Sequence, residues 1–134
     1  GLAMTTQVLI LPFARPPKGL AANDRCHWST RNRSTQLVRA RVCAWGESTV
    51  EPSPRLQVEL VWVVKDRRKR DEDNLWPMLK AVCDGLGSDR GTSARLVADD
   101  SPEFMVKLAP RIEYRPGVER PFFEVRVTRL GSDD

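Results

Sequence analysis

Acidic side chains follow a run of basic ones in the segment KDRRKRDEDN, residues 65–74. Asp71 and Asp73 are separated by one residue, so in an extended segment both carboxylates leave the same side of the chain. Two carboxylates held together repel each other unless a cation joins them or one is protonated. Hard divalent ions such as Mg²⁺ and Mn²⁺ prefer carboxylate oxygens and retained waters. The segment is therefore either a solvated turn or a metal site beside a surface that binds a polyanion.

Further acids and a lysine follow this segment. Asp99 and Asp100 precede the sequence SPEF and could supply a third carboxylate from another loop. Four residues share one face of a predicted helix at i, i+4, i+7 and i+11: Asp73, Pro77, Lys80 and Asp84. The plainer alternative for that face is an exposed surface with a Lys80–Asp84 ion pair worth roughly 0.2–0.5 kcal/mol.

The composition is that of an ordinary soluble protein, with 134 residues, 40% hydrophobic and 30% charged. The net charge of +4 favours an anionic partner. The three cysteines form no CxxC pair, which argues against a disulfide framework or a zinc knuckle and favours reduced, mostly buried thiols. No apolar stretch approaches the length of a membrane span, and a signal-peptide pattern is absent. We therefore expect a cytoplasmic protein without a membrane partner.

The first half of the chain predicts one strand and one helix. An apolar run at residues 7–13 ends in the proline-rich ARPPKG, which indicates a strand and a turn. Residues 21–33 are polar, basic and aperiodic, as in a loop. From 34 to 48 a helix is expected, packed through four residues at helical spacing: Leu37, Val38, Val42 and Trp45.

The second half places the acids at the end of an interior strand. Residues 56–64 alternate and become apolar on both faces, so the strand delivers the basic run and the acids at its C-terminal end. Residues 74–86 predict a helix with one apolar stripe: Leu75, Leu79, Val82 and Leu86. Pro77 must lie in its first turn, which places the N-cap at Asp73 or Asn74. Gly85 and Gly87 are expected to end this helix.

Strands at about 104–114 and 121–130 predict a hairpin, in which Pro110 indicates an edge or a bulge. The order β-α-β-α-β-β then predicts an α+β fold, with a mixed sheet of about four strands and two helices. We expect a single domain over residues 1–134, in which residues 1–3 have the character of a cloning remnant.

The sequence RRKRDEDNLWPMLKAVCDGL, followed by LVADDSPEF, resembles the RusA family of Holliday-junction resolvases, which are small dimeric endonucleases of phages and prophages. The family pattern has basic residues, D-x-D-N, a lysine and an acid on the next helix, and a later D-D. The resemblance is strongest over 62–106. The family usually places its lysine where this chain has Pro77. Either Lys80 reaches the site from one turn further along, or Trp76–Met78 forms an extra turn before a helix that begins later.

The resemblance implies metal-assisted hydrolysis of DNA four-way junctions by a homodimer. Asp71, Asp73 and Asp100 would be catalytic with Lys80, and Asp99 would join the three acids in binding Mg²⁺, for which Mn²⁺ could substitute. The DNA-binding residues would be Arg67, Arg68, Lys69, Arg70, Asn74, Arg25, His27, Arg31 and Arg33. Two alternatives remain: a branched-DNA-binding module with weak or no turnover, and a nuclease for flaps and forks.

Residues outside the motif carry plainer expectations. His27, the only histidine, is expected to contact DNA or to be exposed in a loop. Trp28 could stack on an unpaired base, although a tryptophan that anchors its loop to the core is commoner. Trp45 and Trp62 are assigned to the core. Lys107 is expected on a strand distant from the site.

Overall fold

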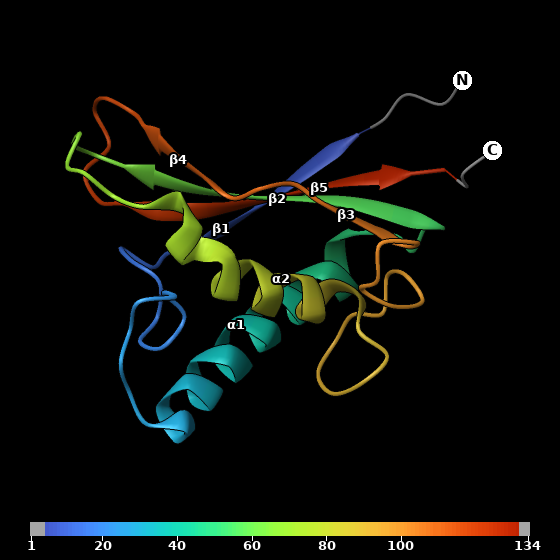
Figure 1. The fold of residues 1–134 in the computed structure, drawn as a ribbon. Coiled ribbons are helices and arrows are strands. Elements are labelled where there is room, and N and C mark those ends of the chain that lie inside the picture. The colour runs from blue at the N-terminus through green and yellow to red at the C-terminus, as the bar shows by residue number, and fades with distance from the viewer. Residues whose placement is uncertain (1–4, 132–134) are drawn as a thin grey trace.

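The computed structural model describes residues 5–131, so the suggested cloning remnant at residues 1–3 lies outside them. Residues 5–131 form two α-helices, one 3₁₀ turn and five strands (Figure 1). In chain order the elements are β1 Thr6–Leu11, α1 Trp28–Thr49, β2 Arg55–Val64, η1 Glu72–Leu75, α2 Trp76–Gly87, β3 Met105–Lys107, β4 Arg111–Tyr114 and β5 Phe122–Leu130. The predicted α+β class is confirmed.

The sheet is mixed and centred on β2. β1 pairs antiparallel with β5, and β5 pairs antiparallel with β2. On its other side β2 pairs parallel with β3 through 56–58 and with β4 through 61–64. Within the described residues the strands number five rather than about four, because the predicted strand 104–114 is divided next to Pro110. Proline lacks the N–H that would continue the ladder.

The predicted hairpin of the last two strands is wrong. Val63 lies between them, opposite Glu113 of β4 on one side and Phe122 of β5 on the other. β4 and β5 are therefore separated by β2. The apolar character of β2 on both faces already indicated an interior strand, but the pattern does not say which strands flank it.

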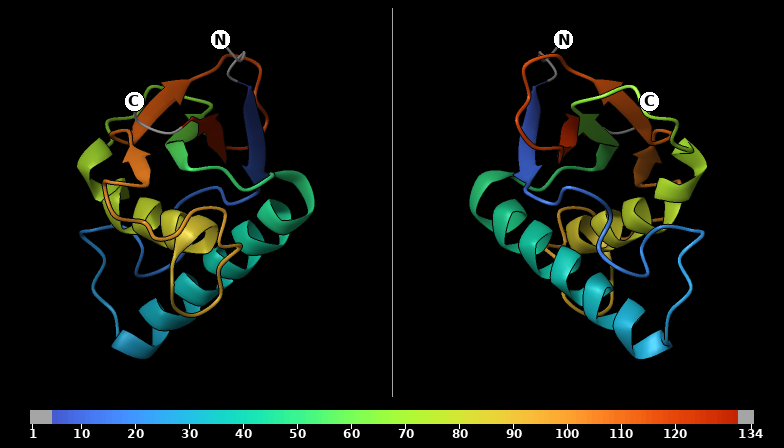
Figure 2. Two further views of the ribbon diagram at one scale, coloured as in Figure 1. Left: turned by 90° about the vertical axis from the view of Figure 1, so that its right-hand side faces the viewer. Right: turned by 90° about the vertical axis from the view of Figure 1, so that its left-hand side faces the viewer.

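α1 and α2 cover the same face of the sheet, as all three ribbon views show (Figures 1 and 2). On this face Val58 lies opposite Val127 and Leu60 opposite Val125, and all four are fully buried. Burying each such side chain contributes roughly 1.5–3 kcal/mol before the entropy cost of ordering it. The core thus fixes β2, and with it the point where the chain leaves the sheet at Lys65.

α1 begins earlier than predicted, since residues 28–33 belong to the helix and not to a loop. His27 caps it, because its Nδ1 accepts a hydrogen bond from the Ser29 backbone N–H at 3.1 Å. Leu37 is 44% exposed, so its assignment to the packed stripe is wrong. The buried residues of α1 are Val38, Val42, Cys43 and Gly46.

α2 is preceded by the turn η1, and Asp71 caps that turn by accepting a hydrogen bond from the Asp73 N–H at 3.0 Å. The predicted N-cap of the helix at Asp73 or Asn74 is therefore wrong: α2 itself starts after Leu75. Pro77 does lie in its first turn, as predicted, and Trp76–Met78 belongs to α2 rather than to an extra turn before it. The stripe of Leu75, Leu79, Val82 and Leu86 is buried as predicted.

The glycines of α2 do not both end the helix. Gly85 lies inside it, and a Cβ there would stand 3.0 Å from the Arg39 carbonyl oxygen and 3.1 Å from the Val42 Cβ. The missing side chain thus allows α1 and α2 to approach closely.

The cysteines agree with the expectation of mostly buried thiols, since Cys43 and Cys83 are buried and Cys26 is half-buried. Burial raises the pKa of Cys83 to about 12.

Candidate functional site

The basic run folds into a tight loop around Asp66 at the end of β2. The Asp66 carboxylate accepts hydrogen bonds from the Arg68 N–H at 3.1 Å and from the Arg70 guanidinium at 2.8 Å. These contacts hold the pKa of Asp66 below its usual value. Arg70 also lies over the Trp62 ring at 5.3 Å, and only 15% of its side chain is exposed. Of the basic run, Arg70 is thus turned inward.

The three acids that follow the loop are exposed and lie in η1 or at its cap. Glu72 fastens the turn to the sheet, because its carboxylate accepts a hydrogen bond from the Ile112 N–H of β4 at 2.9 Å. Asp71 and Asp73 line one surface hollow together with Glu72, Lys69 and Arg70. The structure therefore brings the predicted pair Asp71–Asp73 to one place.

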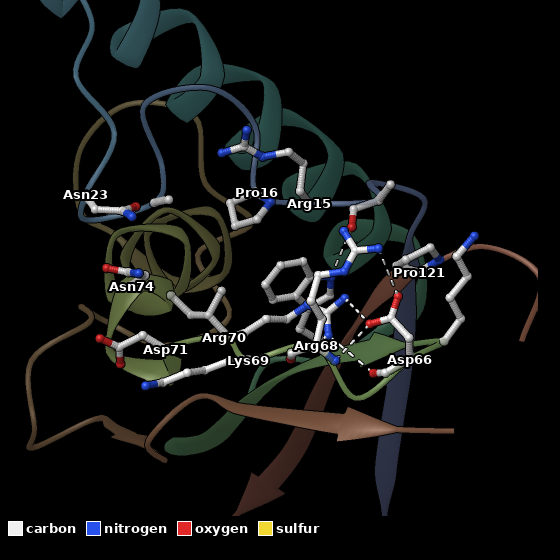
Figure 3. A pocket seen from close by; sticks show the side chains of 15 residues that line it. Arg15, Pro16, Asn23, Asp66, Arg68, Lys69, Arg70, Asp71, Asn74 and Pro121 are labelled. Atoms are coloured by element: carbon white, nitrogen blue, oxygen red, sulfur yellow. Dashed lines mark hydrogen bonds and ion pairs between the residues drawn. The ribbon is translucent and has the colours of Figure 1, made fainter. Parts of the chain in front are cut away.

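A larger cavity, of about 650 Å³, adjoins this hollow and shares Asp71 with it (Figure 3). Its cationic lining residues are Arg15, Lys65, Arg68, Lys69 and Arg70, and its amide residues are Asn23 and Asn74. The apolar lining comes from Ala14, Pro16, Ala21, Trp62, Leu75 and Pro121. The cavity thus lies between the 12–27 loop, the loop after β2 and the start of β5.

The 12–27 loop, which forms one wall of this cavity, is held in place by Asp24. Its carboxylate accepts a hydrogen bond from the Gly19 N–H at 2.9 Å and pairs with Arg15 at 3.2 Å. Backbone hydrogen bonds from Gly19 and Ala21, together with the charges of Arg15 and Lys18, lower the pKa of Asp24 in spite of partial burial. Arg31, a predicted DNA contact, donates to the Gly19 carbonyl at 3.1 Å and so ties the loop to α1.

A second acidic cluster forms further along α2, where Lys80 contacts the carboxyl groups of both Asp84 and Asp100. Lys80 lies 3.5 Å from Asp84 and 3.7 Å from Asp100, and Arg39 lies 3.9 Å from Asp84. Lys107 lies 3.3 Å from Asp100, so its expected distance from the predicted site residues is wrong. β3 brings it there by pairing with β2.

The two carboxyl groups of this cluster titrate in opposite directions. Burial and the hydrogen bond with Asp100 raise the pKa of Asp84 and outweigh Lys80 and Arg39, which lower it. Burial also acts to raise the pKa of Asp100, but the hydrogen bond with Asp84 and the charge of Lys107 lower it further. Of the two carboxyl groups, Asp84 therefore has the higher pKa and Asp100 the lower.

The four predicted metal ligands do not gather in one place. Asp100 contacts Asp84, Lys80 and Lys107, and Asp99 is half-buried beside it in the loop before β3. Across residues 5–131 the structure brings together no group of three or more His, Cys, Asp or Glu side chains that could hold a metal ion. Mg²⁺ is commonly held by one or two carboxylates together with substrate phosphate oxygens. Asp71 and Asp73 fit such a site; a four-acid site stays a prediction.

The remaining predicted DNA contacts lie around the start of α1, which projects away from the sheet (Figure 1). Arg25 and Arg33 are exposed there, and His27 serves as the helix cap. Trp28 is 71% exposed, with its ring centroid 5.5 Å from that of His27, so the expectation of a core anchor is wrong for it. Trp45 and Trp62 are partly buried against the core, in line with their assignment.

Sequence reasoning missed several residues that the fold adds to the site. Arg15, Asn23 and Pro121 line the cavity, while Arg39 and Lys107 join the second acidic cluster. Their segments have no motif and no periodicity that could have identified them. Arg15, Asn23 and Pro121 reach the cavity because the 12–27 loop and the start of β5 are folded next to the end of β2. Arg39 reaches the second cluster from α1, and Lys107 reaches it from β3, which pairs with residues 56–58 of β2.

No family model matches the chain. An uncharacterized protein of Xylella fastidiosa, strain Temecula1, is 28% identical to it over 95 residues, which cover 66% of this chain and 61% of that protein. The chain therefore spans about three fifths of the length of this relative. In the part of the chain that the structure describes, no helix has both the length and the apolar character needed to cross a membrane.

Proposed function

We propose that the chain is a metal-dependent, structure-specific endonuclease that hydrolyses phosphodiester bonds in branched DNA, with the four-way junction as the first candidate substrate. One observation carries the proposal: Asp71 lies on the boundary between an acidic hollow, shared with Asp73, and a cavity lined by cations. A carboxylate pair can hold a divalent cation, while the cations attract the phosphates. The RusA-like motif supports the same function.

The residues would divide the work as follows. Lys65, Arg68 and Lys69 are exposed and would bind backbone phosphates without reading sequence. Asp71 and Asp73 would hold the metal ion at the phosphate that the cations position. A bound Mg²⁺ supplies a water of lowered pKa and neutralises negative charge on the phosphate. Lys80 would add positive charge near the scissile phosphate, provided that the phosphate reaches the second acidic cluster.

A homodimer is part of the proposal, because two symmetric cuts across a junction require two active sites. The face of the sheet opposite the helices is a candidate interface. Val8 and Ile10 of β1 are 45% and 49% exposed, and they alternate with the inward-facing Leu9 and Leu11.

A second candidate function is a branched-DNA-binding module without turnover. The observation that favours it is the position of Asp100, which contacts Lys80 and Lys107 at 3.7 and 3.3 Å and not the Asp71–Asp73 pair. A protein of this kind would keep the cationic cavity and bind junctions, but it would not cut them with any divalent metal. A nuclease for flaps or forks is separated from a junction resolvase by its choice of substrate.

The experiment that tests these functions is a cleavage assay on a labelled mobile four-way junction, a Y-shaped fork and a linear duplex, each with Mg²⁺ and with EDTA. We expect the junction to be cut in Mg²⁺ alone. Asp71→Asn and Asp73→Asn should lower the rate by roughly a hundredfold or more while junction binding persists. Asp100→Asn should do the same if the second acidic cluster takes part in cleavage. Asp99→Asn should have a smaller effect.

Asp89→Asn is the matched control, because Asp89 is an exposed acid in the loop after α2. It should cut like the parent protein. If the junction is bound but never cut, the binding module is the correct function. If the three acid variants all cut at near-normal rates, the metal site at these residues is excluded.

A further inference from the structure

We propose that the 650 Å³ cavity beside Asp71 binds one unpaired nucleotide, with the base inside and its phosphates on the cationic rim. The inference rests on the proposed function and names the part of branched DNA that the site would recognise. Pockets of roughly 300–1,000 Å³ suit small ligands, and a single nucleotide falls in this class. A base can enter such a cavity only when it is released from pairing and stacking.

Polar groups suited to a base edge line one side of the cavity. Asn23 and Asn74 come from different segments, and both lie on the side that also carries Asp71 (Figure 3). A carboxamide offers a donor and an acceptor together, which matches the paired donors and acceptors of a nucleobase edge. These two residues can therefore distinguish a base from a bare sugar–phosphate.

Backbone hydrogen bonds fix the segments that carry the two asparagines. The Asn74 N–H donates to the Asp71 carbonyl at 3.1 Å, and the Asn74 carbonyl accepts from the Ala22 N–H at 3.0 Å. The second bond joins the wall that carries Asn23 to the turn that carries Asp71. A preformed arrangement of this kind lowers the ordering cost of binding.

The packing of Trp62 favours recognition of the base through its hydrogen-bonding edge over stacking of the base on the tryptophan ring. Its ring is stacked on Phe123, with centroids 5.4 Å apart and planes 9° apart, and Arg70 lies over it at 5.3 Å. The ring therefore contributes to the apolar lining and is already packed by its neighbours. Leu75 and Pro121 complete the apolar surface against which a base can lie.

The rim places phosphates between the cations and the acids. The side chains of Arg15 and Arg68 are 60% and 79% exposed, and each is oriented by one acid, Asp24 at 3.2 Å and Asp66 at 3.5 Å. Lys69 lines both the cavity and the acidic hollow. A nucleotide in the cavity would thus direct its neighbouring phosphate towards Asp71 and Asp73.

The test compares three fluorescein-labelled hairpin duplexes by anisotropy, in EDTA and at one salt concentration. The first is fully paired, the second carries a single thymidine bulge, and the third carries an abasic tetrahydrofuran at the same bulge. We expect the thymidine bulge to bind about tenfold more tightly than the abasic bulge, as two hydrogen bonds of roughly 0.7 kcal/mol each would give. The double variant Asn23→Ala, Asn74→Ala should lose most of this preference and keep only the part that the apolar lining gives.

Asn32→Ala is the matched control, because Asn32 is exposed on α1 outside the cavity, and it should keep the preference of the parent. The single variant Asn23→Ala changes an exposed side chain and should lose part of the preference, which guards against misfolding of the double variant. Equal binding of the two bulges by the parent overturns the proposal, as does a double variant that keeps the full preference of the parent.

The absence of metal separates this test from the test of the endonuclease. A preference for the thymidine bulge in a protein that never cuts DNA would support the nucleotide pocket and reject the catalytic function. Cleavage of junctions by a protein without that preference would reject the pocket alone.

Discussion

Lys69 and Arg70 are neighbours in the basic run, but their side chains have different environments. Both line the cavity and the acidic hollow, but Lys69 is exposed, whereas Arg70 is bound to Asp66 and packed over Trp62. An arginine in this position holds the loop through its planar guanidinium and its apolar stem. Formal charge therefore does not by itself identify the residues that face a phosphate.

The first prediction separates these two cations. Lys69→Ala should lower DNA affinity and reduce the slope of log affinity against log salt by about 1, with the free energy of unfolding changed by less than about 0.5 kcal/mol. Arg70→Ala should lower the free energy of unfolding by more than Lys69→Ala does, because it removes the 2.8 Å ion pair with Asp66 and uncovers the Trp62 ring. Urea denaturation and anisotropy titrations measure both. Equal stability of the two variants would contradict the inward role of Arg70.

The second prediction concerns Lys80, which contacts Asp84 and Asp100. If the second acidic cluster takes part in cleavage, Lys80→Ala should lower turnover far more than junction affinity. Lys80→Arg keeps the charge and should retain most of the activity. Lys107 is not a suitable control, because it contacts the same carboxylate. If Lys80→Ala cuts DNA like the parent, Lys80 has no role in cleavage and serves only as the surface ion-pair partner of Asp84.

The third prediction uses the raised pKa of Asp84. An acid whose pKa is raised above 3.8 on folding contributes stability below that pH, and the contribution is lost as the pH rises through the folded-state pKa. Asp84→Asn cannot ionise, and its amide can still donate to Asp100. Relative to the parent, the variant should therefore gain stability as the pH rises above 3.8.

Urea denaturation across this range measures the effect, and Asp89→Asn serves as the exposed control. Asp100 acts in the opposite sense, since its lowered pKa gives stability that is lost as the pH falls below 3.8. If the free energy of unfolding depends on pH in the same way for Asp84→Asn and the parent, a raised pKa of Asp84 is excluded.

At the scale of elements, the crossing of α1 and α2 positions the second acidic cluster. α1 supplies Arg39, which contacts Asp84 of α2 and also donates to the Thr92 and Arg90 carbonyls at 3.0 and 2.6 Å. The Arg39 side chain therefore joins α1, α2 and the loop that follows α2. The close approach at Gly85 is what allows these contacts.

The fourth prediction tests this crossing. Gly85→Ala should lower the free energy of unfolding, because overpacking costs roughly 1–3 kcal/mol while alanine favours a helix interior by only about 1 kcal/mol. Gly131→Ala is the control, since a Cβ at Gly131 meets no atom within 4 Å, and it should change stability by less than about 0.5 kcal/mol. Thermal and urea unfolding both measure the difference. A Gly85→Ala protein more stable than the parent would show that α1 and α2 can move apart at this point without loss of stability.

At the scale of the whole molecule, the helices protect one face of the sheet and leave the other to charged side chains. On that face Glu59 contacts Arg111 at 3.3 Å and Arg126 at 3.5 Å. The exposed Val8 and Ile10 lie at the β1 edge of the same face. Exposed apolar side chains next to alternating charges are compatible with a self-complementary interface.

The fifth prediction is that the protein is a dimer through this face, as measured by light scattering after gel filtration. Ile10→Glu should shift it to a monomer, while Leu37→Glu, at a residue 44% exposed on α1, should leave the dimer intact. Junction affinity should fall steeply with salt, since counterion release governs binding to phosphates. A parent monomer at micromolar concentration that still makes paired cuts would contradict the prediction.

The sequence by itself determined the local features of this protein. Alternation fixed β2 as an interior strand, helical spacing fixed the buried stripe of α2, and Pro77 fixed the first turn of that helix. Each of these follows from neighbouring residues and from the geometry of a single element. The adjacency of Asp71 and Asp73 was likewise predictable, because one residue separates them.

The tertiary structure decided which distant segments meet. Pairing of β3 and β4 with β2 brought Lys107 to Asp100 and separated β4 from β5. Folding of the 12–27 loop against η1 created the cavity between Asn23 and Asn74. Asp100 joined Asp84 rather than the earlier acids. Such contacts depend on strand order and loop closure over many residues, and residue spacing carries no information about either.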